Sequence, residues 1–356
     1  MASSTTDNTN NANNDNLNTE TPRLILRTYK ASDHDQVDHL FYSTYFTLVP
    51  EGVKCKLKSP VFWVLWIAFY SYLLGIVPVL LSGMNWPAWA STALKVFFTF
   101  AWSIVSFAGI FVVTDRFEVV DKVEHVRQND LSDPEVYYLN WTKEEVQVSD
   151  DNEKAGKKRV TFDKDAKPAT ELVRTQKPLE EQAPSHFWVL SLDNRPCGMV
   201  GLAHYKQQIK SNRPLQPPAW KLLAAAALAR YHLPVPESLK DLHTKMPTPI
   251  FAEPHDPKKA TLQRLAIRTE YQDCNLSTLL IDRAMSWADE KGLETVEAKT
   301  NELESKAADI LSTQHGFKLV KTEKKGWFGQ YEKTWTCDVK EWMAAHEEGA
   351  KTYKKN

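Results

Sequence analysis

Few residues in this sequence are of a type that could do chemistry, and most familiar catalytic arrangements are missing. The four cysteines are scattered without a C-x-x-C pair, at Cys55, Cys197, Cys274 and Cys337. We interpret them as reduced thiols in a cytosolic environment rather than as a disulfide framework. His204 and His255 fit loop or packing roles better than metal ligation, because no spacing such as H-E-x-x-H accompanies them. We therefore expect no metal.

A polar loop and one strand carboxylate remain as candidates for a site. The loop, Gln272-Asp-Cys-Asn275-Leu-Ser277, leads into a helix predicted from Leu276 to Lys291. An ordinary helix entry with Asn275 or Asp273 as its N-cap explains the same residues without any ligand. Glu297 lies on the next predicted strand and is the candidate general base. The alternative for Glu297 is an exposed strand carboxylate with no catalytic role.

The elements that must position these residues alternate between strand and helix. Alternating apolar residues predict strands, and acidic first turns or terminal glycines mark helix ends. The predicted strands span 23–28, 186–192, 197–203, 261–267, 295–300, 317–321 and 331–339. The predicted helices span 32–45, 276–291 and 304–315, with a short helix after the last strand.

Two long apolar runs interrupt this alternation early in the chain. No charged residue occurs from Val61 to Leu81, and only Lys95 interrupts the run from Ala88 to Thr114. About 20 apolar residues in a helix cross a hydrocarbon core of about 30 Å. A pair of buried helices in a soluble core is the alternative, but such helices rarely run this long without a charged face. The runs therefore predict a transmembrane hairpin.

Basic residues flank this hairpin on one side only. Lys54, Lys56 and Lys58 precede the first run, and Arg116 and Lys122 follow the second. The connecting turn carries no lysine or arginine before the second run. By the positive-inside rule both flanks are cytosolic. We expect an integral membrane protein of the endoplasmic reticulum, with its termini and main domain in the cytosol.

Composition indicates which of the remaining segments are disordered and which partners the chain lacks the charge to bind. The 356 residues carry a net charge of −1, so nothing points to a nucleic-acid partner. The Asn/Thr/Ser-rich start lacks the features of a signal peptide, and residues 141–185 are rich in lysine and glutamate. The predicted segments are a disordered tail (1–22), a first strand and helix (23–58), the hairpin (59–114), a helical connector (115–140), a disordered charged insertion (141–185), a main domain (186–339) with an insertion at 206–259, and a C-terminal helix and tail (340–356).

The order of these elements resembles the GNAT superfamily of acetyl-CoA-dependent N-acetyltransferases. The resemblance is strongest from Leu262-Gln-Arg-Leu-Ala-Ile267 through the helix that ends at Gly292, and again at His315-Gly-Phe317. Two spans between the first helix and the strand pair are similar to the membrane-anchored, camello-like branch. The resemblance implies an α/β (α+β) fold with a GNAT-like mixed, mostly antiparallel sheet, flanked by helices and interrupted by the transmembrane hairpin.

The resemblance also implies a co-substrate site for acetyl-CoA. In the family, backbone N–H groups of a splayed strand face the thioester oxygen, and here that strand would be Leu265, Ala266 and Ile267. The loop before the helix receives the pyrophosphate through its N–H groups and the helix dipole. That loop would comprise the following residues: Gln272, Asp273, Cys274, Asn275, Leu276 and Ser277. Asn301, at the end of a strand, matches a position that often contacts the pantetheine arm.

The sequence departs from the family pattern at several of these positions. The family loop reads Q/R-x-x-G-x-G/A, and Asn275 and Ser277 replace its small residues. Asn tolerates positive φ, so the turn can form, whereas Asp273 puts a negative charge beside the phosphates. Ser312 stands where the family often has a tyrosine that donates a proton to the leaving thiolate. A serine hydroxyl is a weaker acid than a tyrosine hydroxyl.

Two functions follow from this pattern. The first is a membrane-anchored N-acetyltransferase, an acyltransferase that acts on a small-molecule or protein amine at the cytosolic face of a lipid bilayer. The second is a GNAT-fold membrane scaffold or binding protein that has lost catalysis. A hairpin that only shapes membranes leaves the patterned residues after 186 unexplained.

Overall fold

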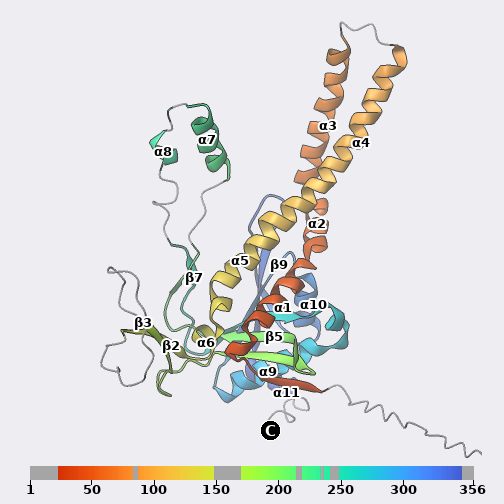
Figure 1. Cartoon of the computed structure of the whole chain (residues 1–356). Coiled ribbons are helices and arrows are strands. Elements are labelled where there is room, and N and C mark those ends of the chain that lie inside the picture. The colour runs from red at the N-terminus through yellow and green to blue at the C-terminus, as the bar shows by residue number, and fades with distance from the viewer. Residues whose placement is uncertain are drawn as a thin grey trace, which may run out of the picture.

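The computed structural model describes residues 23–82, 87–147, 170–213, 219–232, 234, 236–240 and 248–346. The predicted tail at 1–22 and the end of the chain from 347 onward lie outside these residues. Figure 1 shows a folded domain from which a pair of long helices projects.

A seven-stranded mixed sheet forms the centre of the folded domain. Its strand order is β1-β4-β5-β8-β9-β11-β10. Neighbouring strands run antiparallel except β8 and β9, which are parallel. The strands are β1 (Leu24–Thr28), β4 (His186–Leu192), β5 (Arg195–Ala203), β8 (Lys259–Ile267), β9 (Thr295–Asn301), β10 (Lys318–Lys324) and β11 (Tyr331–Asp338). The predicted fold class, a mostly antiparallel mixed sheet flanked by helices, is confirmed.

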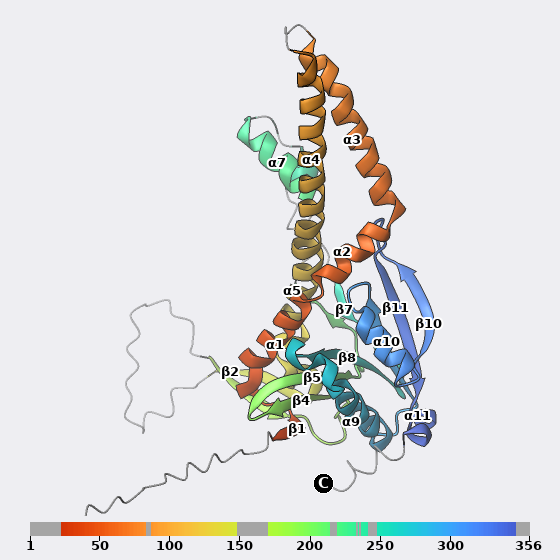
Figure 2. The same ribbon diagram turned by 90° about the vertical axis from the view of Figure 1, so that its right-hand side faces the viewer.

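Helices cover both faces of this sheet because its strands alternate apolar side chains between two cores. In β5, Val200 and Leu202 pack in one core with α9 (Leu276–Glu290) and α11 (Val339–Ala345). Met199 and Ala203 pack in the other core with α1 (His34–Phe46) and α5 (Val120–Gln128). Figure 2 shows α1 and α9 on either side of the strands, with α10 (Ser305–Thr313) beside β11.

Two helices, α3 (Pro60–Leu81) and α4 (Ala88–Val113), form the hairpin at the predicted positions. Both are long and apolar enough to cross a membrane, and only 6% of the residues in either apolar window are buried. A soluble core helix would instead be mostly buried. The short helix α2 (Val49–Lys58), which the sequence analysis does not predict, joins α1 to α3.

The connector after α4 returns the chain to the domain through a series of short helical segments. A π-helical segment, η2 (Thr114–Val119), continues α4 into α5. The 3-10 segment η3 (Asp130–Ser132) and the helix α6 (Pro134–Tyr138) follow. The helical connector is thus interrupted at Ser132-Asp-Pro134, and Pro134 begins a new helix as a proline at the first helical position can.

The prediction of disorder for 141–185 is wrong for the described part of that segment. The strands β2 (Trp141–Gln147) and β3 (Thr170–Gln176) pair as an antiparallel ribbon. The many charges are used in ion pairs at its base, where Arg174 pairs with Glu135 and Lys143 pairs with Asp133. Composition alone suggested a solvated loop because it does not show which charges meet. Residues 148–169 lie outside the described part of the chain.

The described part of the second insertion contains a small ribbon and two helices. β6 (Ile209–Lys210) pairs with β7 (Ile250–Ala252), and beyond them lie α7 (Ala219–Arg230) and α8 (Glu237–Lys240). In both views α7 lies on the same side of the sheet as the hairpin (Figures 1 and 2). The remaining 3-10 segments are η1 (Ala31–Asp33) and η5 (Thr269–Cys274).

Candidate active site

The parallel strands β8 and β9 separate halfway along their length. They pair only from Lys259 to Leu262 on β8 and from Thr295 to Ala298 on β9. Arg264 has φ +56°, and the register against β5 shifts between Met199 and Gly201. This bulge bends β8 away from β9, since an extra residue in one strand kinks it. The backbone from Leu265 to Ile267 thus lies beyond the last pair with β9, where an extended ligand could bind it. We call the space between this part of β8 and the end of β9 the gap.

A buried polar network holds the bulge in place. The Arg264 guanidinium donates two hydrogen bonds to the Asp130 carboxylate, Nε to Oδ2 at 2.6 Å and Nη2 to Oδ1 at 2.9 Å. The Tyr138 hydroxyl donates to the same Oδ2 at 2.5 Å. Asp130 is fully buried, so the bidentate pair with Arg264 and the Tyr138 hydroxyl together compensate its carboxylate for lost hydration. Because Asp130 belongs to η3, the connector from the hairpin fixes the shape of the gap.

The loop before α9 has the backbone geometry that the sequence analysis expected. Asn275 adopts φ +59° and ψ +19°, which confirms the predicted positive φ. It makes no side-chain capping hydrogen bond, and the first turn of α9 contains no acidic residue. The N–H groups that begin an α-helix have no partner within that helix, so this end can accept an anion. Asp273 is exposed beside it.

Gln272 and Ile267 connect this loop to the bent strand. The Gln272 amide donates to the Ile267 carbonyl at 3.3 Å. The hydroxyl of Thr44, at the end of α1, reaches the same carbonyl at 3.4 Å. The predicted strand and loop residues thus lie at one end of the gap. Their contacts with a co-substrate stay a prediction.

A tyrosine and a glutamate meet at the C-terminal end of β9. The Tyr45 hydroxyl donates a short hydrogen bond to Glu304 Oε1, and the Asn301 amide reaches that hydroxyl at 3.4 Å. Glu304 also accepts from the Asn301 backbone N–H at 3.0 Å. Burial raises the pKa of Glu304, although the Tyr45 bond opposes the shift. Burial, and then the nearby Glu304 carboxylate, raises the pKa of Tyr45 well above its ordinary value. Each residue keeps some exposed surface as a whole, although its ionisable group is buried.

Sequence reasoning missed this pair. Tyr45 and Glu304 are 259 positions apart, so no local spacing connects them. From sequence, Glu304 is interpreted as an ordinary residue at the start of a helix, because it directly precedes α10. Tyr45 is interpreted as part of the apolar stripe of the first helix. Asn301, which the sequence analysis did select, was the available signal, because both partners contact it.

The predicted acid and base lie at other places. Glu297 is on the paired half of β9, between Thr261 of β8 and Thr336 of β11, with Lys259 Nζ 4.0 Å from its carboxylate. Ser312 is in the last turn of α10 and donates to the Asp309 carbonyl at 3.2 Å. Two residues later, Gln314 accepts a hydrogen bond from Thr278 in the first turn of α9 at 3.4 Å, so the end of α10 lies near the start of α9. Their catalytic roles stay predictions.

The remaining candidate residues have structural partners. His204 and His255 lie with ring centroids 5.8 Å apart, and the His255 ring bonds Thr261 Oγ1 at 2.7 Å. Burial, and then His204, lowers the pKa of His255 to about 4. Cys274 is exposed in the loop, and all four cysteines are free. Within the described ranges no group of three or more His, Cys, Asp or Glu side chains could hold a metal ion.

Comparison with known proteins places this geometry in a recognised fold. Residues 154–317 match the model of the acetyltransferase (GNAT) family, a region just under half of the chain. It includes β8, the loop, α9, β9 and α10. The fold is therefore GNAT-like, and the match supports acetyl transfer as the class of reaction. No curated protein matches the chain.

Several solved acetyltransferases are similar to the chain at low identity. A GNAT-family acetyltransferase from Staphylococcus aureus Mu50 is 9% identical with a TM-score of 0.38, covering 89% of this chain and 99% of that one. A putative streptothricin acetyltransferase from Bacillus anthracis, solved with acetyl coenzyme A, is 10% identical with a TM-score of 0.27, covering 56% and 85%. The ribosomal-protein-S18-alanine N-acetyltransferase from Escherichia coli is 10% identical with a TM-score of 0.27, covering 45% and 72%.

Proposed function

We propose that this protein is a membrane-anchored N-acetyltransferase that transfers acetyl from acetyl-CoA to an amine at the cytosolic face. The observation that carries the proposal is the divergence of β8 from β9 beside an uncapped helix start. The GNAT family match covers both features. Neighbouring strands in the centre of a sheet ordinarily pair along their whole length. The unpaired backbone left here suits a ligand that adds to a strand edge through backbone hydrogen bonds.

The arrangement supplies the groups that acetyl transfer requires. The amine nitrogen bonds to the acetyl carbon, the carbon–sulfur bond breaks, and the leaving thiolate takes up a proton. Backbone N–H groups from Leu265 to Ile267 would stabilise the developing oxyanion, as fixed donors do best in a site that excludes water. Residues 273–278 would receive the pyrophosphate at the start of α9. Asn301 would border the pantetheine arm.

Glu304 and Tyr45 are the acid–base pair that we favour. A raised pKa makes the Glu304 carboxylate a stronger base toward the attacking amine. The Tyr45 hydroxyl, bonded to it, can pass a proton toward the leaving sulfur. Glu297 as base and Ser312 as acid are the alternatives from sequence. Kinetics of the two glutamate variants distinguish between them, as the Discussion describes.

Several features support a membrane location for the hairpin. α3 and α4 expose apolar side chains along their length, including Val64, Phe97 and Ile104. The turn after β10 carries Trp327, which is 85% exposed, and the backbone of this turn contacts Cys55 in α2. An exposed tryptophan next to lysine-rich sequence is typical of a membrane interface. We propose that this turn faces the cytosolic surface of the endoplasmic reticulum membrane.

Labelling can test the proposed topology. A single cysteine introduced at Asn85, with Cys274 and the other native cysteines replaced by serine, should react with an impermeant reagent only from the lumenal side. A cysteine near residue 350 should react only from the cytosol. Reaction of both positions from the same side contradicts the hairpin topology.

Calorimetry with acetyl-CoA tests the proposed activity most directly. The detergent-solubilised full chain should bind acetyl-CoA at micromolar to millimolar concentration, and binding should be lost in Asn275→Val. The catalytically degenerate scaffold is the competing function, favoured by the exposed Asp273 carboxylate beside the loop. No binding at millimolar acetyl-CoA, and none restored by Asp273→Gly, would leave the scaffold function.

A further inference from the structure

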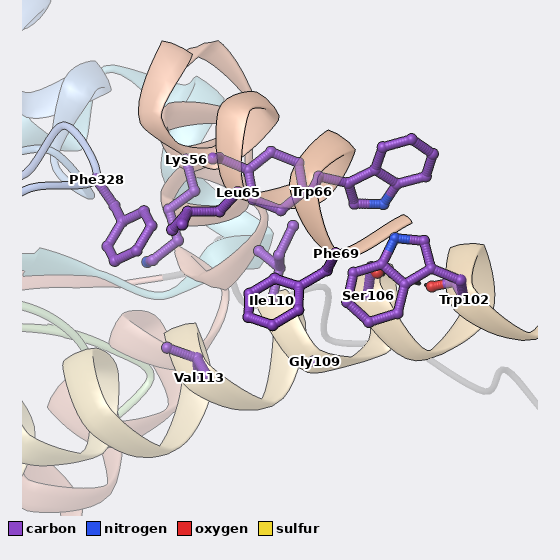
Figure 3. A pocket seen from close by; sticks show the side chains of 11 residues that line it. Lys56, Leu65, Trp66, Phe69, Trp102, Ser106, Gly109, Ile110, Val113 and Phe328 are labelled. Atoms are coloured by element: carbon purple, nitrogen blue, oxygen red, sulfur yellow. Dashed lines mark hydrogen bonds between the residues drawn. The ribbon is translucent and has the colours of Figure 1, made fainter. Parts of the chain in front are cut away.

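An apolar crevice lies between the two hairpin helices where they meet the folded domain (Figure 3). Its volume is about 320 Å³, at the lower end of small-molecule sites, which span about 300–1,000 Å³. Trp66 and Phe69 of α3 line it on one side, and Trp102 and Gly109 of α4 line it on the other. From Val113 at the domain end, Trp102 lies about 16 Å along α4 at about 1.5 Å per residue. The crevice therefore suits one extended apolar chain.

The domain end of the crevice adjoins the end of β9. Lys56 and Phe328 line this end. One helical turn before Lys56, Gly52 lies so close to Leu303 that an added Cβ would be 2.6 Å from its side chain. Leu303 directly precedes Glu304, the proposed base. A chain held in the crevice would thus place its polar end at the same junction of α2, η2 and β9 that borders the gap.

The charged groups at this junction favour a cationic head. Three carboxylates, Glu118, Glu302 and Glu304, lie there with two ammonium groups, those of Lys56 and Lys122. Lys56 pairs with Glu118, and Lys122 pairs with Glu302 at 2.7 Å. Of the three carboxylates, Glu304 alone has no ion-pair partner among the described residues, because its contacts are Tyr45 and Asn301. A protonated amine would give it one, whereas a phosphate or carboxylate head would add a like charge beside it.

The far end of the crevice holds two hydrogen-bond donors without an acceptor. The indole N–H groups of Trp66 and Trp102 are buried and have no hydrogen-bond partner in the part of the chain that the structure describes. Both side chains project into the crevice, and their ring nitrogens lie on facing sides (Figure 3). Lipid hydrocarbon offers no acceptor, and a buried donor left unpaired is costly. A ligand chain that carries an oxygen at this depth would satisfy them.

We propose that the crevice selects the acetyl acceptor, a single-chain amphipathic primary amine with an acceptor oxygen along its chain. The amine reaches the gap from the bilayer with its chain between α3 and α4 and its head near Glu304. The inference rests on the proposed acetyltransferase activity and names the class of its acceptor.

Two glycines provide a matched pair of variants. A Cβ at Gly109 or at Gly75 meets no atom within 4 Å, so a side chain can be added at either position without a clash at its first carbon. Gly109 lines the crevice, whereas Gly75 of α3 does not. With the full chain in lipid nanodiscs, the KM for dodecylamine should be at least tenfold below that for propylamine. Gly109→Leu should raise the KM for dodecylamine to the level of propylamine, and Gly75→Leu should behave as the wild type.

Binding without turnover gives an independent readout. A brominated dodecylamine should quench tryptophan fluorescence saturably in the wild type and in Gly75→Leu, but not in Gly109→Leu. A matched chain with an ether oxygen should bind several-fold tighter, and the double variant Trp66→Phe/Trp102→Phe should lose that gain. Quenching that is non-saturable and equal in both glycine variants, or a KM that is independent of chain length, overturns the inference. Absence of acetyl-CoA binding would instead overturn the proposed activity.

Discussion

The paired half and the divergent half of β8 and β9 differ in their backbone hydrogen bonding and in the environment of their carboxylates. In the paired half, residues 259–262 hydrogen-bond to residues 295–298, and Glu297 lies there among ordinary strand neighbours. In the divergent half, the backbone from Leu265 to Ile267 has no partner on β9, and Glu304 meets Tyr45 where β9 ends. Both halves contain a carboxylate, but only the second is desolvated and bonded to a proton donor.

The comparison indicates that the proposed site lies where the pairing of β8 with β9 stops. A sheet uses its backbone donors to hold its strands together, so they are free for a ligand only beyond the last pair. The bulge at Arg264 ends the pairing, and Asp130 holds the bulge from the connector that follows the hairpin. The hairpin and the divergent half of the β8–β9 pair are therefore joined through this connector.

The largest expected effect is on the rate of acetyl transfer. Glu304→Gln should lower kcat by about 10²- to 10⁴-fold, the contribution of a positioned general base. Glu297→Gln, in the paired half, should change kcat by no more than a few-fold. The measurement is thiol release from acetyl-CoA with dodecylamine as acceptor. A large loss in Glu297→Gln with little in Glu304→Gln would reverse the comparison and restore the sequence-based candidate.

Breaking the bulge network should strongly lower stability. Arg264→Met leaves Asp130 charged, buried and unpaired, which should cost about 3–5 kcal/mol in the free energy of unfolding. The exposed pair of Lys258 and Glu294, at the start of the paired half, provides the control. Lys258→Ala should cost less than about 1 kcal/mol. Denaturant titration in detergent measures both, and equal costs would show that the bulge network has no special role.

The loop at the divergent half should respond in its affinity for acetyl-CoA. Like charges about 4 Å apart repel by about 1–4 kcal/mol, depending on solvent. Asp273→Gly should therefore tighten binding by at least about fivefold, since each 1.4 kcal/mol is a factor of ten. Asn275→Val should abolish binding, since a β-branched residue resists φ +59°. Asn275→Gly is the control and should keep wild-type affinity in calorimetry. Wild-type affinity in Asn275→Val would show that the turn is not used.

The smallest expected effect is a pH dependence of stability in the paired half. The His255 pKa is lowered to about 4 by burial, and its ring bonds Thr261 of β8. The folded protein therefore binds fewer protons than the unfolded chain between about pH 6.5 and pH 4, so stability falls as pH falls through that window. The pKa of Asp282, raised to about 6 by burial, acts in the opposite direction.

A variant isolates the contribution of His255. His255→Gln should show a shallower decline in melting temperature from pH 7 to pH 5 than the wild type does, because Asp282 is present in both proteins. His39→Gln, on the surface of α1 rather than near β8, should follow the wild-type curve. Identical slopes for wild type and His255→Gln would contradict the prediction.

Much of the fold was predictable because it rests on local pattern. The period-two alternation located β4 and β5, and the charge-free runs located α3 and α4. The turn at Asn275 was also predictable, since a residue's tolerance of positive φ is an intrinsic property. The sequence erred at β2 and β3, where charged residues form a ribbon through partners that composition does not reveal.

The sequence by itself determined the order of elements, the two apolar spans and the left-handed turn before α9. Only the tertiary structure decided which carboxylate is desolvated. Tyr45 meets Glu304, and Asp130 meets Arg264, across 259 and 134 positions of the chain. The physical reason is that backbone preference acts over a few residues. The pKa of a side chain depends instead on burial and on charges that folding brings together from distant positions.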